Sequence, residues 1–380
     1  MKMTKEIFDW VETNFDRQLE LHKTLAQIPA PSGKEEMRVE FITGWLRDHG
    51  VRDVFVDDAL NVICPFGMTD SNQLVVYCAH SDVVFPDMTP LPLKEEDGRL
   101  CCPGIGDDTA GVVPLMMVAE YIAKNDLKTS DVGVLIVINS CEEGLGNLKG
   151  VRKLFEDYQG RISTFVTLDS TLNLVIDQAV GSHRYEVTVS TEGGHSYNKF
   201  GNQNAIAELS KIINEIYEIK VPTKPGTKTT YNVGLIEGGT SVNTIAQSAK
   251  MLCEYRSDDK ECLEYMEAEF KRIFESAGKR VSIAVNMVGD RPCSSTSPIK
   301  IDALKRIITP IIEDTIGEKV KFVSGSTDCN IPLSLGVAAI CIGTDIHDKT
   351  HTREEWIDKK SILTGLSIAI KTSLELTSAV

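Results

Sequence analysis

Short apolar runs recur along this chain, and their spacing constrains its fold more than any other feature. They cover residues 54–56, 61–66, 74–79, 133–138, 163–168 and 337–342. Several are continuous stretches of valine, isoleucine and leucine, which is typical of strands buried on both faces of a sheet. Helical patterns lie between them, near residues 109–124, 146–157 and 300–314. Strands that alternate with helices predict an α/β sandwich.

The N-terminal region predicts two helices before the first of these strands. The second helix is expected to open at Ser32-Gly-Lys-Glu35, which follows the proline-bounded turn Ile-Pro-Ala-Pro. This spacing is a capping-box pattern, in which serine and glutamate side chains satisfy the free backbone N–H groups of a helix start.

Residues 182–290 follow a different pattern and predict a separate, inserted domain. Strands are expected at 184–190, 229–236, 248–256 and 281–288, with helices at 203–219 and 260–277. The order β-α-β-β-α-β is the ferredoxin-like α+β arrangement. A length of 380 residues also favours two domains. We therefore expect a catalytic α/β domain formed by 1–181 and 291–380, and an inserted domain formed by 182–290.

The composition argues against several kinds of partner and location. A net charge of −15 disfavours nucleic acid and anionic membranes as partners, since both bind basic surfaces. No apolar run reaches the ~20 residues needed to span a bilayer, and the N-terminal segment has no apolar signal core. Many of the ten cysteines lie in or beside apolar strands, and no Cys-x-x-Cys occurs. Reduced core thiols and a cytoplasmic location are therefore expected.

Acidic residues and histidines stand where the predicted strands run out into loops. They are His80, Asp82, Asp107, Glu142, Glu143, Asp169 and His351. In open α/β sheets, ligands gather beyond the carboxyl ends of the strands. This set would hold two divalent metals and leave one carboxylate to act as a base, which is enough to hydrolyse an amide bond.

Each motif taken alone also has a simpler interpretation. His80 could bind a metal while Asp82 fixes its tautomer, or Asp82 could cap a helix. Asp107 could bridge two metals, or it and the next acid could be two carboxylates favourably placed at a helix N-terminus. The pair Glu142-Glu143 could be a metal ligand beside a base, or two solvated loop acids.

The series of motifs resembles one known family. His-Ser-Asp-Val-Val, Gly-Asp-Asp-x-Ala-Gly, Cys-Glu-Glu-Gly, Leu-Asp-Ser and a late His-Thr occur in the order found in the dizinc exopeptidases and amidohydrolases. That family includes peptidase T, glutamate carboxypeptidase, succinyl-diaminopimelate desuccinylase and acetylornithine deacetylase. The resemblance covers nearly the whole chain, and it implies the family's fold, with the inserted domain acting as a lid and dimerisation domain.

The resemblance also implies a metal site with two Zn²⁺ ions per subunit, for which Mn²⁺ or Co²⁺ could substitute. His80 and Asp169 would bind one ion, Glu143 and His351 would bind the other, and Asp107 would bridge the two beside a shared hydroxide.

Two further acids would serve the catalytic step. By the same resemblance, Asp82 would orient His80 and Glu142 would be the general base that takes the proton of the attacking water. A cis peptide bond is expected after Asp107, as is common in the family.

Four residues resemble positions that contact the substrate or its oxyanion. They are His195, Asn243, Arg256 and Asp328. His195 resembles a histidine that reaches the partner's active site in dimeric relatives, so a homodimer through the inserted domain is expected. For Arg256, an ordinary salt bridge at a strand end is the alternative. The family usually has lysine at the position of Thr109 and glycine at that of Ser326, and neither difference removes a ligand.

The expected function is metal-dependent hydrolysis of a peptide or related amide bond by a zinc metallopeptidase. An exopeptidase is favoured, either a tripeptidase-like aminopeptidase or a carboxypeptidase acting on small peptides. The alternative is an N-acyl-amino-acid deacylase with the same metal centre. A non-catalytic binding protein on this fold would require a damaged ligand set. A metallophosphoesterase is disfavoured because no arginine cluster or phosphate-binding loop accompanies the acids.

Overall fold

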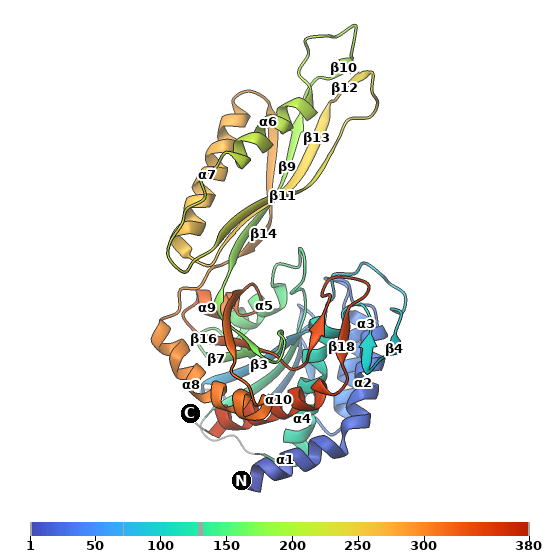
Figure 1. The fold of residues 1–380 in the computed structure, drawn as a ribbon, viewed down its shortest axis with the longest axis vertical. Coiled ribbons are helices and arrows are strands. Elements are labelled where there is room, and N and C mark those ends of the chain that lie inside the picture. The colour runs from blue at the N-terminus through green and yellow to red at the C-terminus, as the bar shows by residue number, and fades with distance from the viewer. Residues whose placement is uncertain (1, 71, 128–131, 379–380) are drawn as a thin grey trace. The chain divides into compact units, whose positions relative to one another are not determined.

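The computed structural model describes residues 2–70, 72–127 and 132–378. The chain divides into two compact units. Unit 1 comprises Met1–Ala179 with Ser295–Val380, and unit 2 is the continuous segment Val180–Ser294 inserted between them (Figure 1). The sequence-based prediction placed the inserted domain at 182–290.

An eight-stranded sheet forms the centre of unit 1. Its strand order is β1-β2-β6-β3-β7-β16-β8-β15. The strands are β1 (Phe55–Val56), β2 (Val62–Phe66), β3 (Leu74–His80), β6 (Gly133–Asn139), β7 (Ile162–Thr167), β8 (Leu174–Ala179), β15 (Lys321–Gly325) and β16 (Ala338–Ile342). The central strands β6, β3, β7 and β16 are mutually parallel. The predicted α/β fold class is confirmed, although β8 and β15 were not predicted.

Helices cover both faces of this sheet. The helices of unit 1 include α1 (Lys2–Thr13), α2 (Phe15–Gln27), α3 (Glu36–Asp48), α4 (Ala110–Lys124), α5 (Lys149–Asp157), α8 (Pro298–Ile316), α9 (Asn330–Ser334) and α10 (Ser361–Ser378). Of these, α1 packs on α10 and α2 packs on α4. A smaller sheet of order β17-β18-β5-β4 lies in the same unit. Its strands are β17 (His347–Asp348), β18 (Trp356–Asp358), β5 (Arg99–Cys101) and β4 (Lys94–Glu96).

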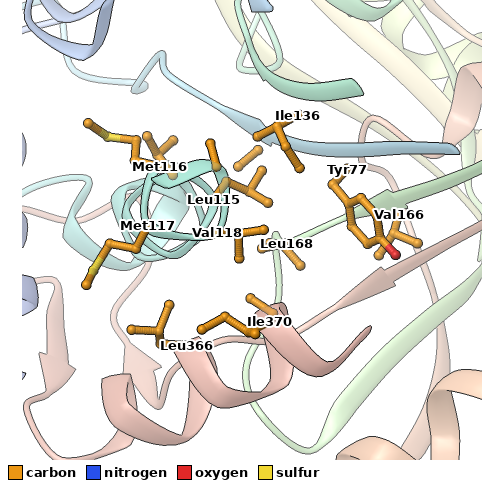
Figure 2. Packing of buried hydrophobic residues seen from close by; sticks show 14 of the residues in the cluster. Tyr77, Leu115, Met116, Met117, Val118, Ile136, Val166, Leu168, Leu366 and Ile370 are labelled. Carbon is orange, nitrogen blue, oxygen red and sulfur yellow. The ribbon is translucent and has the colours of Figure 1, made fainter. Parts of the chain in front are cut away.

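The main core lies between the sheet and the helices α4 and α10. Figure 2 shows Leu115, Met116, Met117 and Val118 of α4 beside Tyr77, Ile136, Val166, Leu168, Leu366 and Ile370. Burial of an apolar side chain of this size contributes about 1.5–3 kcal/mol to stability. The other face carries a second core against α5 and α9. Because both faces are covered, the central strands are continuous apolar runs, as the sequence indicated.

Two expectations for the N-terminal region are wrong. It forms three helices, because the chain breaks at Asn14, whose Nδ2 donates to the carbonyl oxygen of Trp10 at 2.7 Å. The predicted capping box does not form. Helix α3 begins at Glu36, its N-cap residue is Glu35, and that side chain makes no capping hydrogen bond.

Unit 2 has the predicted order of elements. They are β9 (Gly181–Ser190), α6 (Ala205–Tyr217), β11 (Thr229–Gly238), β13 (Ser248–Ser257), α7 (Lys260–Gly278) and β14 (Ser282–Arg291). The four strands form an antiparallel sheet of order β11-β13-β9-β14, and both helices pack on its apolar face. Two short strands, β10 (Gly194–His195) and β12 (Thr244–Ile245), form a separate pair.

The structure also describes the state of the cysteines and the character of the helices. All ten cysteines are free thiols, and only Cys101 is partly exposed. Within the described ranges, none of the helices combines the length and the apolar character that a bilayer crossing requires.

Candidate metal centre

The carboxyl ends of adjacent parallel strands bring the predicted ligands to one edge of the large sheet. Strand β3 ends at His80, β6 is followed by Glu142 and Glu143, and β7 is followed by Asp169. Since β6, β3 and β7 are neighbours and run in the same direction, these side chains leave the sheet side by side. The alternative that Glu142 and Glu143 are two solvated loop acids is wrong, because these residues are only 4% and 5% exposed.

Asp107 lies between two histidines. Its Oδ1 is 2.9 Å from Nε2 of His80, and its Oδ2 is 3.0 Å from Nε2 of His351. His351 also lies 2.9 Å from Oε1 of Glu143, and Nε2 of His80 is 3.9 Å from Oδ1 of Asp169. The structure therefore brings together all five residues predicted to bind metal. Their contacts fall into two groups, one at His80 and one at His351, and Asp107 belongs to both.

The residue after Asp107 holds this arrangement to the sheet. The peptide bond between Asp107 and Asp108 is cis, as the family resemblance implied. Oδ2 of Asp108 accepts the backbone N–H of His80 at 3.0 Å, and Oδ1 accepts that of Gly111 at 3.1 Å. Asp108 therefore joins the end of β3 to the first turn of α4.

The carboxylate of Asp82 joins three segments of the chain. It accepts the backbone N–H groups of Glu142 and Glu143, each at 2.9 Å, and the hydroxyl of Ser32 at 2.5 Å. Cys141, with φ of 57°, turns the chain after β6 so that both N–H groups face Asp82. Oδ1 of Asp82 is 3.5 Å from Nδ1 of His80, and the backbone oxygen of Asp82 is 3.1 Å from that nitrogen.

The segment before α3 supports these turns, which explains why the capping box does not form. The hydroxyl of Ser32 donates to Asp82 at 2.5 Å instead of accepting a backbone N–H at a helix start. Oε1 of Glu35 accepts the N–H groups of Gly33 at 2.8 Å and Cys141 at 3.1 Å. The buried guanidinium of Arg38 donates to the carbonyl oxygen of Ser81 at 3.0 Å. These side chains serve long-range partners, and a local sequence pattern does not show such partners.

Burial and mutual repulsion set the charges of the cluster. Burial raises the pKa of Glu143 to about 7, with a further contribution from Asp107, and raises that of Asp169 well above its usual value. Burial alone would raise the pKa of Asp107 too, but hydrogen bonds from His351 and His80 outweigh it and lower that pKa. The contacts with Asp107 and Glu143 raise the pKa of His351 to about 10. The cluster thus favours a positive charge at its centre.

These residues fit divalent cations. Ligand atoms of His80, Asp107 and Glu143 all lie within 4.8 Å of one another, and so do those of His80, Asp108 and Asp169. Both oxygens of Asp108 already accept backbone N–H groups, so Asp169 is the freer ligand of the second group. Imidazole nitrogens and carboxylate oxygens are the donors of zinc sites, and manganese or cobalt accepts them as well.

Asp328, predicted to contact substrate, is fully buried in unit 1. Its Oδ2 accepts Nδ2 of Asn139 at the end of β6, at 2.8 Å. Burial, and next the charge of Glu142, raise the pKa of Asp328 to about 7. This burial favours support of the Asn139 turn over direct contact with a substrate.

The other predicted substrate residues belong to unit 2, where they fall into two places. His195 lies in β10 and Asn243 directly precedes β12, where the N–H of Ser196 donates to the carbonyl oxygen of Asn243 at 2.9 Å. Arg256 lies near the far end of β13, roughly 27 Å along the strand from Ser248 at about 3.4 Å per residue.

The guanidinium of Arg256 makes the salt bridge that was the alternative to substrate binding. Its Nε is 2.8 Å from Oε1 of Glu254, and its Nη2 is 3.0 Å from Oε2. This pairing with Glu254 is two-pronged and holds the side chain along β13.

Sequence reasoning missed several side chains of the centre. Ser32 and Glu35 were assigned to a helix start, and Asn139 and Glu355 were not singled out. Glu355 is 1% exposed, and its carboxylate contacts the backbone beside Asp107. The only signal available was its place in His351-Thr-Arg-Glu-Glu-Trp, where one of two adjacent acids directly precedes the short strand β18.

Comparisons with known proteins agree with this geometry. A model of peptidase family M20/M25/M40 matches residues 76–375 of the chain. The succinyl-diaminopimelate desuccinylase of Corynebacterium glutamicum is 24% identical over an alignment of 347 residues, which covers 88% of this chain and 90% of that relative.

Two solved structures have the same fold. Aminopeptidase PepT of Bacillus cereus superposes with a TM-score of 0.71 at 20% identity, over 96% of this chain and 99% of that one. The YXEP protein of Bacillus subtilis, a dinuclear metal binding peptidase of the M20 family, superposes with a TM-score of 0.67 at 14% identity, over 97% and 99%.

Proposed function

Because this chain belongs to peptidase family M20/M25/M40, we propose that it is an exopeptidase that cleaves short peptides at a centre of two divalent metal ions. Family membership makes it a metal-dependent hydrolase of peptide or related amide bonds, as the motif series predicted. The observation that carries the finer proposal is the position of Asp107, whose two oxygens lie 2.9 Å and 3.0 Å from two different histidines.

The proposed ligands divide between two ions. His80 and Asp169 would hold one ion, Glu143 and His351 would hold the other, and Asp107 would contact both. When bound, the ions supply Lewis-acid polarisation of the scissile carbonyl and lower the pKa of a water molecule. Zinc is the expected metal, and the same donors suit manganese and cobalt.

Glu142 would move the proton. The water oxygen forms a bond to the carbonyl carbon while one proton passes to the Glu142 carboxylate. As the C–N bond breaks, that proton passes to the nitrogen of the leaving amine. Two observations support this role. The backbone N–H of Glu142 donates to Asp82, and the charge of its carboxylate helps to raise the pKa of both Glu143 and Asp328. Asp82 would orient the ring of His80.

Hydrolysis of a panel of tripeptides, dipeptides and N-acyl amino acids tests the proposal. Cleavage should stop after chelation and return when Zn²⁺, Mn²⁺ or Co²⁺ is added. Glu142→Gln should lower kcat by about 10²- to 10⁴-fold, the usual contribution of a general base, without loss of bound metal. Glu156→Gln, which changes an exposed residue of α5, is the control. Full turnover by Glu142→Gln would remove that residue from the mechanism.

Deacylation of N-acyl amino acids is the second candidate. It is supported by the likeness over 88% of this chain to a desuccinylase. The same residues and proton path would serve it, since an N-acyl bond is also an amide. A kcat/KM for N-succinyl or N-acetyl amino acids that exceeds the value for every peptide would establish the deacylase and overturn the exopeptidase.

We also propose that unit 2 forms a homodimer. Strand β11 is an edge of its sheet and exposes Leu235 and Ile236, at 38% and 53%. Ile206 of α6 lies beside Gly238 and is 40% exposed, so the apolar surface continues onto the helix. An edge strand with exposed apolar residues is a pairing site. Light scattering should give a dimer that Ile236→Lys dissociates; Val285→Lys, on the opposite edge strand β14, should not.

In such a dimer, His195 would stabilise the oxyanion of the partner's reaction. Nδ1 of His195 faces the backbone N–H groups of Tyr197 at 3.3 Å and Asn198 at 3.4 Å. A neutral ring therefore carries its proton on Nε2 and offers it as a donor. Mixing His195→Ala subunits with Glu142→Gln subunits should restore activity if His195 acts across the dimer; a mixture as inactive as its components would contradict this.

A further inference from the structure

Glu355 is a buried carboxylate that the proposed reaction does not use. It is 1% exposed and lies four residues after His351, at the start of β18. Its backbone N–H donates to the carbonyl oxygen of Thr352 at 3.3 Å, so it closes the turn that follows His351. Its carbonyl oxygen accepts the N–H of Cys102 at 3.0 Å, which ties this turn to the segment leading to Asp107.

The Glu355 carboxylate binds the backbone of that segment at three points. Oε1 accepts the N–H groups of Gly106 at 2.7 Å and Asp107 at 2.9 Å, and Oε2 accepts that of Gly104 at 2.9 Å. A ring of backbone N–H groups is a natural site for a carboxylate, because the dipoles stabilise the buried negative charge. One of these three donors belongs to Asp107 itself.

Gly106 is needed for this close approach. A Cβ at position 106 would lie 2.8 Å from Cβ of His347 and 3.1 Å from Oε1 of Glu355. The first distance is shorter than real Cβ contacts, so any other residue would push the segment away from Glu355. The glycine in Gly-Ile-Gly-Asp-Asp thus serves the carboxylate on the facing turn.

From these contacts we propose that Glu355 is a positioning residue, whose carboxylate holds Asp107 between His80 and His351. The inference rests on the proposed function, because it concerns the metal ligands named there. The turn that contains Glu355 also carries His351, and the segment it binds carries Asp107. One side chain therefore sets the distance between two ligands that are more than 200 residues apart in the sequence.

Metal binding by the full-length chain tests this role independently of activity. Co²⁺ is titrated into metal-free protein and followed by its visible absorption, for the wild type, Glu355→Gln and Glu354→Gln. Glutamine has the same size as glutamate, but its NH₂ group replaces one acceptor oxygen. That NH₂ group would face a backbone N–H, and two donors cannot form a hydrogen bond. We expect Glu355→Gln to bind Co²⁺ about 10- to 100-fold more weakly, the usual effect of losing such a supporting contact. Glu354→Gln, the exposed neighbour, should match the wild type.

The outcomes separate the two proposals. If wild-type protein binds no Co²⁺, the proposed metal function fails, and the role of Glu355 fails with it. If wild type binds Co²⁺ and Glu355→Gln binds it equally well, only the positioning role is overturned, even where the melting temperature has fallen. If Glu355→Gln does not fold, Glu355→Asp decides, because it keeps the charge and shortens the reach; unchanged affinity in that variant overturns the inference.

Discussion

Removal of the Ser32 hydroxyl should impair catalysis through Asp82. In Ser32→Ala, the carboxylate loses the donor at 2.5 Å and keeps the N–H groups of Glu142 and Glu143, each at 2.9 Å. A hydrogen bond to a charged group contributes about 1.5–3 kcal/mol. If the site bears this whole loss, kcat/KM should fall by about 10- to 100-fold, since 1.36 kcal/mol corresponds to a factor of ten.

The assay is kcat/KM with the best substrate of the panel at saturating metal, alongside metal content and melting temperature. Ser32→Thr keeps the hydroxyl and should stay within a few-fold of wild type. Ser163→Ala is the matched control, because its hydroxyl donates to the carbonyl oxygen of Leu74 at 3.2 Å, at the opposite end of β3. A Ser32→Ala enzyme as active as Ser163→Ala would refute the argument that this hydroxyl holds Asp82.

Three further predictions concern stability, each measured by urea unfolding of metal-free protein. Burial lowers the pKa of His22 from 6.5 to about 4. The contribution of this shift to the free energy of unfolding is therefore fully present above pH 6.5 and is lost as the pH falls toward 4. Between pH 7 and pH 5 the wild type should lose about 2 kcal/mol more than His22→Gln, and equal losses would contradict the shift. Tyr77→Phe removes a buried hydroxyl that donates to the carbonyl oxygen of Thr372 at 2.8 Å, and should cost about 1 kcal/mol with kcat unchanged. Gly365→Ala should destabilise the protein by about 1–3 kcal/mol, because the new Cβ would overlap the carbonyl oxygen of Thr344. This cost outweighs the ~1 kcal/mol by which alanine favours a helix over glycine. A more stable variant would disprove the overlap.

Much of the fold could be predicted because burial leaves a local mark on the sequence. The runs at 74–79 and 133–138 became β3 and β6, which have every residue buried. Strands β8 and β15 were missed because they are partly or largely exposed, so they lack a continuous apolar run. At the break between α1 and α2, the side chain of Asn14 donates to the carbonyl oxygen of Trp10, a contact that apolar periodicity does not record.

The sequence predicted the proposed ligand residues of the candidate site, but not the side chains that hold those residues in place. His80 was found because ligand residues gather where strands end, a position that the sequence alone can indicate. Asp107 was found from Gly-Ile-Gly-Asp-Asp, which precedes a predicted helix. Ser32 formed a convincing local pattern with Glu35, yet both side chains serve partners 50 and 106 residues away. A local motif does not reveal these contacts, because the position of the buried carboxylate is set by distant segments of the chain.

The sequence by itself therefore determined the α/β class, the inserted domain and the identity of the acids and histidines, because strand burial and strand ends are local properties. The tertiary structure alone decided that Asp107 lies between His80 and His351, and that Ser32 and Glu355 hold the neighbouring segments. These contacts join residues separated by up to 251 positions. They exist only once parallel strands bring their carboxyl ends to one edge, where buried charges must find hydrogen-bond partners.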